Sequence, residues 1–314
     1  MLQTLALSDI YRPIDKDLTA FQTALQEQLH SEDPLLRDIG RHILEISGKH
    51  LRPALTIFTA RMHGETTDLP IRMAITIELL HTATLVHDDI VDGSSFRRNR
   101  ESLNQKWGNE IALIGGDYIY AKAFLSLSEI ADPRVNRMFS HCALRICEGE
   151  MKQVETRKTP RVTEEQYLAM IQKKTAVLFE TACAAGGYAA GLSAPQVQKL
   201  AEYGRCFGMT YQIVDDCLDL VGSAKVLGKE NGSDFEKNDP TLPLIYLMGE
   251  MNGDFPAGDF ARVRALAVER GAVERSLAVA RRYAAQAAAA LESSPAGPCR
   301  KSLLDLIDFT LQRV

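Results

Sequence analysis

Two acidic clusters with the same spacing stand out among the residues that could do chemistry. HDDIVD and IVDDCLDL both contain the pattern DDxxD, and each follows an apolar run. The six aspartates are Asp88, Asp89 and Asp92 in the first cluster, and Asp215, Asp216 and Asp219 in the second. On a helix, residues four apart share a face and lie about 6 Å apart along the axis, so the carboxylates of each cluster can converge. Like charges at this spacing repel each other, so both clusters need a positive counter-charge.

The counter-charge that fits best is a divalent cation. A single DDxxD could be the solvated end of a surface helix, because acidic residues are common there. Two copies beside the apolar runs ATLVH and YQIV do not suit that interpretation. Mg²⁺ prefers oxygen ligands, keeps several waters and bridges one or two carboxylates to phosphate oxygens. The clusters therefore predict a magnesium site for a phosphorylated substrate, provided that the two helices meet in the fold.

Basic residues near the clusters predict where phosphates bind. In GKHLRPAL, Lys49 and Arg52 precede Pro53, which predicts a helix that begins at Pro53 with Arg52 extended before it. The N–H groups at a helix N-terminus favour an anion. Arg97 and Arg98 follow the first cluster, and adjacent arginines generally diverge, so each can face a different phosphate group.

Further cations are Lys173 and Lys174, followed by Thr175 on a predicted helix, and Lys225 and Lys229 in a polar stretch. Each of them alone could be an ordinary surface residue. Two basic groups beside two acidic clusters instead predict a site for two diphosphates, one bound through metals and the other bound directly by cations.

The elements that must position these residues are helices. Apolar residues recur at intervals of three and four almost throughout, and the alternation of half-buried strands is essentially missing. We expect an all-α fold with one domain over residues 1–314, since no long polar linker divides the chain. Residues 222–240 are predicted to form a mobile polar loop after the second cluster. The predicted helices run over 17–29, 34–47, 53–63, 69–92, 110–130, 134–155, 164–190, 194–220, 243–248, 261–270, 272–291 and 299–313.

Composition limits the class of protein. A hydrophobic fraction of 46% and a charged fraction of 25% are typical of a folded globular chain. The net charge of -5 gives no electrostatic signature of nucleic-acid binding. Six cysteines without a CxxC spacing suit reduced thiols. We find no signal-peptide pattern and no uncharged stretch near the roughly 20 residues that span a bilayer, so we expect a cytoplasmic protein with at most peripheral membrane contact.

Taken together, HDDIVD with its two arginines, GKHLRP, QIVDDCLD, LGKENGSD and TLPLI resemble the trans-isoprenyl diphosphate synthases, or polyprenyl synthetases. The resemblance extends from about Pro34 to the C-terminus and includes GDYIYAKAF, GEMKQ and KTAVLF. It implies helices around a deep central cavity, usually in a homodimer. The implied reaction condenses isopentenyl diphosphate with an allylic diphosphate, with Mg²⁺ as cofactor.

The resemblance also implies residue roles. Mg²⁺ is expected on Asp88, Asp92 and Asp215, with Asp89, Asp216 and Asp219 in support. Isopentenyl diphosphate is expected against Lys49, Arg52, His81 and Arg98. The allylic diphosphate is expected against Arg97, Lys174, Thr175, Gln212 and Lys229. One departure is NDPTLP where family members often have GKxTLP, so Asn238 and Asp239 replace a glycine and a lysine and remove a cation near the allylic diphosphate.

Small residues before the first cluster predict a long product. In the family, bulky aromatic residues four and five positions before the first aspartate limit the chain to short products, whereas Thr84 and Ala83 occupy these positions here. Leu80 or Ile77 would then lie nearer the floor of the cavity. Since each helical turn adds about 5.4 Å, close to one isoprene unit, we expect a product of roughly six to ten units, hexaprenyl to decaprenyl. A farnesyl or geranylgeranyl diphosphate synthase is the alternative, and Ala83 could also be a simple packing residue.

Two other classes remain as alternatives. A class I terpene cyclase also ionises a prenyl diphosphate but needs no second diphosphate pocket, so Lys49, Arg52 and Arg98 argue against it. A non-catalytic partner subunit would be free to lose its aspartates, and this chain retains all six. Whether the enzyme is a homomer or one subunit of a heteromeric prenyl synthase stays open.

Overall fold

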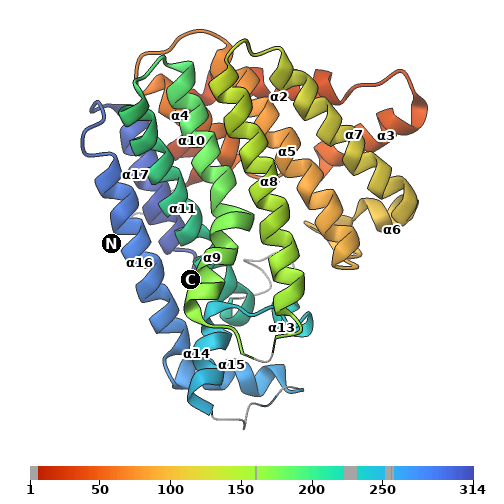
Figure 1. Ribbon diagram of the computed structural model, residues 1–314, viewed down its shortest axis with the longest axis vertical. Coiled ribbons are helices and arrows are strands. Elements are labelled where there is room, and N and C mark those ends of the chain that lie inside the picture. The colour runs from red at the N-terminus through yellow and green to blue at the C-terminus, as the bar shows by residue number, and fades with distance from the viewer. Residues whose placement is uncertain (1–5, 160, 223–231, 252–255, 257) are drawn as a thin grey trace.

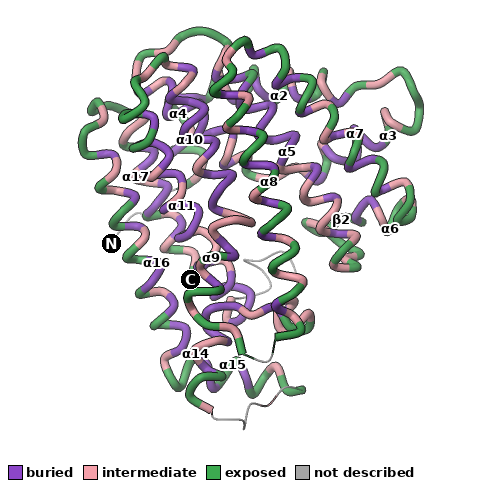
Figure 2. The backbone as a smooth tube through the Cα atoms, in the orientation of Figure 1, coloured by how far each residue is buried: buried purple, intermediate pink, exposed green. Residues whose placement is uncertain are grey.

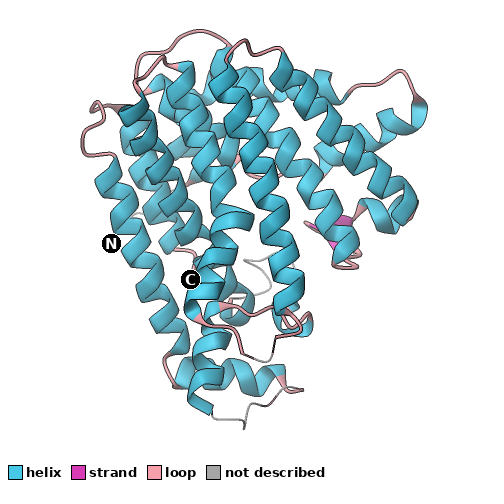
Figure 3. Cartoon of the chain, in the orientation of Figure 1, coloured by secondary structure: helices cyan, strands magenta, loops and turns pink. Residues whose placement is uncertain are grey.

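The computed structural model describes residues 6–159, 161–222, 232–251, 256 and 258–314, which form a bundle of long helices (Figure 1). Its centre consists of α4 (Leu51–Arg61), α5 (Leu69–Val91), α10 (Val177–Ala189) and α11 (Ala194–Val221). Here α10 packs on both α4 and α11, and α4 packs on α5. The all-α prediction is confirmed, as Figure 3 shows.

Other helices surround this centre. α7 packs on α5, α8 packs on α10, α16 and α17 pack on α11, and α2 packs on α5. These are α2 (Asp15–Leu29), α7 (Asn109–Ser128), α8 (Pro133–Thr156), α16 (Ala272–Ala290) and α17 (Pro298–Leu311). The remaining described helical segments are α1 (Leu7–Tyr11), a 3-10 helix (Arg12–Ile14), α3 (Pro34–Glu45), α6 (Leu103–Trp107), α9 (Glu164–Ile171), a π-helical turn (Gln172–Ala176), α13 (Ser233–Glu236), α14 (Leu242–Met251) and α15 (Phe260–Glu269).

Several helices begin where the sequence supplies a cap for their free N–H groups. Asp33 accepts a hydrogen bond from the backbone N–H of Leu36, ahead of Pro34 at the start of α3. Thr163 and Gln166 form a reciprocal capping box at the start of α9. Such local signals explain why most predicted helix starts agree with the structure.

The helix α5 carries the first aspartate cluster, and most of its residues are buried or half-buried (Figure 2). Its length and apolar composition would allow it to cross a bilayer, but 67% of its most apolar window is buried inside the protein. It is therefore the core helix of this bundle. Its enclosure fixes the direction of the helix end at which the aspartates lie.

Three local predictions need correction. α4 begins at Leu51, so Pro53 lies in its first turn and Arg52 is helical, not extended. Proline is tolerated there because its missing N–H would have no partner in the first turn. Residues 222–240 are not all loop, since α13 forms at Ser233–Glu236. Two short strands, β1 (Phe96–Arg97) and β2 (Arg100–Glu101), also form an antiparallel hairpin that helical periodicity could not reveal.

Candidate active site

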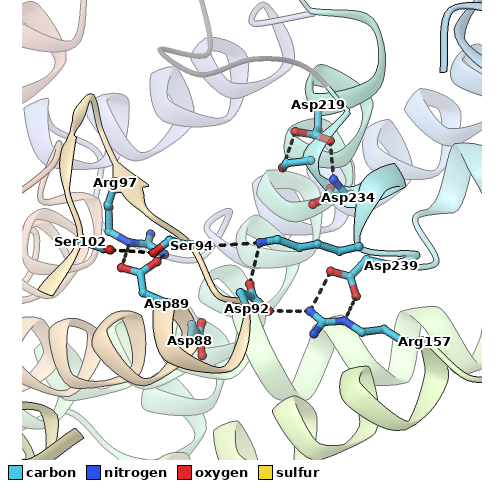
Figure 4. Close-up of polar contacts among 12 residues, drawn as sticks. Asp88, Asp89, Asp92, Ser94, Arg97, Ser102, Arg157, Asp219, Asp234 and Asp239 are labelled. Atoms are coloured by element: carbon cyan, nitrogen blue, oxygen red, sulfur yellow. Dashed lines mark hydrogen bonds and ion pairs between the residues drawn. The ribbon is translucent and has the colours of Figure 1, made fainter. Parts of the chain in front are cut away.

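The two aspartate clusters lie at one site and are joined through α13 (Figure 4). At the start of this helix, Ser233 Oγ and the backbone N–H of Asp234 donate to the two carboxylate oxygens of Asp219, each at 3.0 Å. At its C-terminal end, Lys237 Nζ donates to Asp92 Oδ2 at 2.9 Å. This short helix therefore links the last aspartate of the second cluster to the last aspartate of the first, and the clusters face a common site.

Lys174 lies between two carboxylates on the inner side of the site. Its Nζ is 3.7 Å from Asp88 Oδ2 and forms a close ion pair with Glu150. Burial raises the pKa of Asp88 to about 7, with Glu150 adding to the increase and Lys174 opposing it. The pKa of Lys174 is raised, because Asp88 and Glu150 outweigh the effect of burial. One ammonium group thus serves two carboxylates, and Asp88 is left short of positive charge.

A chain of hydrogen bonds leads from the next residue to the second cluster. Thr175 Oγ1 donates to Gln212 Oε1 at 2.8 Å, and Gln212 Nε2 donates to Asp216 Oδ1 at 2.6 Å. Tyr167 donates its hydroxyl to Asp216 Oδ2 at 2.6 Å. Burial is the main cause that raises the pKa of Asp216 well above its ordinary value. The predicted neighbours Lys174, Thr175 and Gln212 are therefore brought together with both clusters.

A π-helical turn, Gln172–Ala176, sets the direction of Lys174 and Thr175. Such turns are rare and occur mostly as single-turn bulges, frequently at functional sites. Glycines on both sides allow neighbouring helices to approach it. A Cβ at Gly149 of α8 would meet the backbone N of Lys174 at 2.5 Å, and one at Gly208 of α11 would meet the Cα of Ala176 at 2.7 Å. This close packing explains how one turn can reach both clusters.

Arg97 and Arg98 diverge, as expected. Arg97 donates from Nε and Nη2 to Asp89 at 2.8 and 2.6 Å, a two-point pair with a carboxylate that is 4% exposed. Arg98 occupies the turn of the hairpin, where it and Asn99 have φ angles of 51° and 65°. Its Nη1 donates to Ile46 O at 2.8 Å. The turn of the hairpin thus sends the two guanidinium groups to different helices.

The cations predicted for isopentenyl diphosphate form a second group. Arg52 Nη1 donates to His81 Nε2 at 3.1 Å and stacks over Phe179, 4.2 Å from the ring centroid. The Arg98 guanidinium lies against Gly48, where any side chain would overlap it, while Lys49 Nζ lies 5.5 Å from the centroid of the Phe309 ring. Burial and neighbouring arginines hold the pKa of His81 well below its ordinary value, so its Nε2 can accept the bond from Arg52. Crowded cations of this kind favour the binding of an anion.

The last aspartate expected on a metal, Asp215, has a partner from the C-terminus. Arg313 Nη2 donates to Asp215 Oδ1 at 2.9 Å and lies 5.1 Å from the centroid of the Tyr211 ring. Arg313 was not predicted, because it follows a helix far along the chain from either cluster. Glu150, Arg157, Tyr167 and Lys237 were not predicted either, although Glu150 lies in the GEMKQ stretch that supports the resemblance.

One predicted cation lies away from the site, and two others are not among the described residues. Lys173 Nζ forms an ion pair with Glu148 at 2.8 Å, and both side chains are 44% exposed, so it lies at the surface. Lys225 and Lys229 lie outside the described residues. The role predicted for Lys229 therefore stays a prediction.

The residues expected to control product length lie on a face of α5 that packs against α7. Thr76 Oγ1 is 3.1 Å from Ser126 Oγ, and His87 Nε2 is 3.3 Å from Leu113 O, both on α7. Leu80 and Ala83 fall between Thr76 and His87 at helical spacing and are 1% and 0% exposed, Ile77 is also 0% exposed, and Thr84 is half-buried. A cavity of about 30 Å³, lined in part by Ser47, His81, Leu85 and Arg98, adjoins the second cation group. A cavity deep enough for a polyprenyl chain stays a prediction.

The acidic side chains fit a divalent metal by their chemistry. Among the described residues, no three His, Cys, Asp or Glu side chains are grouped tightly enough to hold an ion as they stand. Instead, Asp88, Asp92 and Asp215 each have a lysine or arginine in contact, at 3.7, 2.9 and 2.9 Å. These cations balance carboxylates that are hard oxygen ligands, the donor type that Mg²⁺ and Ca²⁺ prefer. A bound divalent cation would take over part of that charge balance.

Comparison with known proteins agrees with this geometry. The family model for polyprenyl synthetase matches residues 33–255. Heptaprenyl diphosphate synthase component 2 of Geobacillus stearothermophilus is 33% identical, over 96% of this chain and 97% of the relative. Octaprenyl diphosphate synthase of Escherichia coli is also 33% identical, over 95% and 96%. This chain belongs to the polyprenyl synthetase family.

A solved member of this family has the same fold. The polyprenyl synthase from Caulobacter crescentus, complexed with calcium and isoprenyl diphosphate, has a TM-score of 0.93 at 30% identity, with 99% of each chain covered. The family uses divalent metal ions, which agrees with the donor set found here.

The raised pKa of Asp88 predicts how the stability of the metal-free protein depends on pH. The folded state binds this proton more tightly than the unfolded chain, so the free energy of unfolding decreases as pH rises from about 4 to about 7. Thermal melting in EDTA should show that Asp88→Asn reduces this decrease, while Asp308→Asn, an exposed change on α17, leaves it unaltered. An unchanged slope in Asp88→Asn would contradict the assignment.

Proposed function

We propose that this protein is a Mg²⁺-dependent trans-polyprenyl diphosphate synthase that condenses isopentenyl diphosphate with an allylic diphosphate. One observation carries the proposal: two aspartate clusters meet beside Lys174, and a separate group of cations lies next to them. The carboxylates suit a metal-bound diphosphate, and the cations suit a diphosphate held directly. A site for two diphosphates is what a condensation of two prenyl substrates requires.

The residues divide the work of the reaction between two substrates. Asp88, Asp92 and Asp215 would hold Mg²⁺, which when bound neutralises the diphosphate that leaves. Lys174, Thr175 and Arg97 orient the allylic diphosphate at the same end of the site, while Asp89 and Asp216 keep Arg97 and Gln212 in place.

The cation group at Lys49, Arg52, His81 and Arg98 holds isopentenyl diphosphate. The C–O bond of the allylic diphosphate breaks with both electrons leaving on the diphosphate. The double bond of isopentenyl diphosphate then attacks the allylic cation and forms the new C–C bond. A proton is lost from the isopentenyl unit to the departing diphosphate, and a new double bond forms. Water must be excluded because it would capture the allylic cation.

A terpene cyclase explains the residues of this site less well. A cyclase ionises one prenyl diphosphate and has no use for the second cation group. In this chain, Arg52 is directed at His81 by a hydrogen bond and at Phe179 by stacking, so the group is built into the core. Burying cations costs free energy, and a second anionic substrate that pairs with them explains why they are buried.

We also propose a product of roughly six to ten isoprene units. The small side chains of Ala83 and Thr84 leave the upper part of α5 without a bulky block, and Leu80 and Ile77 lie one to two turns deeper, at about 5.4 Å per turn. The relatives named as heptaprenyl and octaprenyl diphosphate synthases support this range over farnesyl or geranylgeranyl diphosphate.

For assembly, we propose a homodimer formed through α7. This helix exposes two pairs of apolar side chains, and soluble monomers rarely leave large contiguous apolar surfaces uncovered. Met151 on α8 adds to the exposed apolar surface of the chain. A second subunit is the alternative, because one relative is named as component 2 of its enzyme. The exposed residues of α7 are Leu113, Ile114, Phe124 and Leu125, at 51%, 67%, 40% and 63% exposure.

The purified chain alone should release diphosphate from farnesyl diphosphate plus isopentenyl diphosphate when Mg²⁺ is present, and EDTA should abolish this. Asp88→Asn and Asp215→Asn should each lower kcat about 10²–10³-fold, because charge on the leaving group is then less well stabilised. Asp308→Asn serves as the control. Activity that appears only after a second chain is added would instead establish a heteromeric enzyme.

Replacing Ala83 with Phe should shorten the product by one or more isoprene units, since a ring at this position blocks the path along α5. Mass analysis of the extracted products measures the shift. Val268→Phe, an exposed change on α15, should leave the distribution as it is. If Ala83→Phe is folded and active but makes the wild-type product, Ala83 is a packing residue and not part of the wall.

The double change Ile114→Asp and Leu125→Asp should convert the dimer to a monomer, because it places one charge in each of the two exposed apolar pairs of α7. Light scattering after size-exclusion chromatography measures the mass. The control is Leu35→Asp, which adds a charge at an exposed residue of α3. A wild-type chain that is already monomeric would rule out the proposed homodimer.

A further inference from the structure

The loop that departs from the family pattern carries a buried carboxylate in place of a lysine. Asp239 is only 7% exposed and forms a two-point pair with Arg157, from Nε at 2.6 Å and from Nη2 at 3.0 Å. A carboxylate at this position would repel a diphosphate if it were not neutralised. Arg157, at the C-terminal end of α8, supplies that neutralisation.

The same arginine also reaches the first aspartate cluster. Arg157 Nη2 donates to Asp92 Oδ1 at 2.7 Å, and Lys237 Nζ donates to Asp92 Oδ2 at 2.9 Å. Lys237 Nζ also lies 3.4 Å from Ser94 Oγ. Both carboxylate oxygens of Asp92 are therefore held by cations, as Figure 4 shows for Arg157. Although burial alone would raise the pKa of Asp92, these two hydrogen bonds bring it below its ordinary value.

The backbone after α13 fixes which residue makes which contact. Asn238 takes a left-handed conformation with φ 57°, which asparagine tolerates better than most residues. The N–H of Asp239 then donates to Asp234 O at 2.8 Å and closes the end of the helix. Lys237, before this turn, reaches Asp92, while Asp239, after it, reaches Arg157. The turn therefore places the ammonium group of Lys237 in the site, although the position that usually carries a lysine is Asp239.

The two cations differ in how firmly they are held. Arg157 makes three hydrogen bonds to two carboxylates, and its side chain is 17% exposed. Lys237 makes its ion pair through one freely rotating ammonium group, and its side chain is 28% exposed. A divalent metal on Asp92 would repel both. Lys237 is the cation that can move, and Arg157 is the one that stays.

We propose that Lys237 binds the diphosphate of the allylic substrate, supplying the cation that the loop lacks, and that Arg157, fixed by Asp239, is a positioning residue for Asp92. In the structure Lys237 is a counter-ion of Asp92. When metal and diphosphate arrive, the ammonium group moves from the carboxylate to a phosphate oxygen. This inference rests on the proposed function, because it assigns a ligand to the allylic diphosphate.

The test is calorimetric binding of inorganic pyrophosphate in the presence of Mg²⁺, with the full chain. Lys237→Met should weaken binding about tenfold, the loss of roughly one charge-assisted hydrogen bond. It should also raise KM for the allylic substrate while KM for isopentenyl diphosphate stays unchanged. Lys152→Met, which removes an exposed ammonium group paired with Glu155 on α8, is the matched control.

The competing explanation predicts a different change in pyrophosphate affinity when Lys237 is removed. If Lys237 only neutralises Asp92, its removal frees the carboxylate for metal, and pyrophosphate binding becomes tighter or stays equal. Either result would overturn the inference. A wild-type chain that binds pyrophosphate but makes no polyprenyl product would contradict the proposed function instead, so the two failures are distinct.

A second set of variants tests the exchange of charges directly. The double change Asn238→Gly and Asp239→Lys restores the family's loop lysine and keeps Arg157 in contact with Asp92. In this background, Lys237→Met should cost much less than tenfold in pyrophosphate affinity, because the second lysine can replace it. A full tenfold loss in both backgrounds would show that Lys237 does not stand in for the loop lysine. Thermal melting checks that each variant is folded.

Discussion

The site depends on its buried and half-buried carboxylates, whose negative charge is balanced by hydrogen bonds and ion pairs from other helices and loops. Asp216 accepts hydrogen bonds from a tyrosine hydroxyl and an amide, and Asp219 accepts them from a serine hydroxyl and a backbone N–H. Asp88, Asp89, Asp92 and Asp215 each contact a lysine or an arginine. At the three aspartates proposed to bind metal, Asp88, Asp92 and Asp215, these cations are the groups whose place a metal would take.

Helix ends and close packing bring these groups together. Asp92, Arg157 and Lys237 each lie at the C-terminal end of a different helix, where unpaired carbonyls favour the two cations. The π-helical turn at Gln172–Ala176 adds one residue to a helix that would otherwise run straight, and the absence of side chains at Gly149 and Gly208 lets its neighbours close around it. The result is a polar site at one end of an otherwise apolar bundle, with the core helix α5 leading away from it. A substrate with an anionic head and a hydrocarbon tail matches that division.

Periodicity was sufficient to predict most of the helices, and the repeated spacing of the aspartates indicated two clusters that could share one site. These are properties that a short stretch of sequence encodes locally, through apolar spacing, caps and repeated charges. The role of Lys49, Arg52, His81 and Arg98 came from the resemblance to the family. The contacts of Glu150, Arg157 and Arg313 could not be predicted in the same way, because each depends on where the end of another helix lies. The π-helical turn was also missed, since one extra residue leaves the apolar pattern of the predicted 164–190 helix almost unchanged. The predicted helix start at Pro53 was wrong by two residues, because α4 begins at Leu51 and proline is acceptable anywhere in the first turn.

The exchange at Asn238 and Asp239 shows why a motif can change while the electrostatics of the site are kept. Packing interactions require atoms in contact, so a lost side chain must be replaced at the same place. Charge acts over several ångströms, and it can be restored from a different residue on a different element. Here the carboxylate that replaces a lysine is neutralised by Arg157, and Lys237, two positions earlier, reaches the aspartate cluster. Compared with the family pattern at position 239 alone, the loop has lost a cation. Summed over the four side chains of Asp92, Arg157, Lys237 and Asp239, two cations balance two carboxylates. The proposed metal and diphosphate would therefore meet side chains whose charges already cancel.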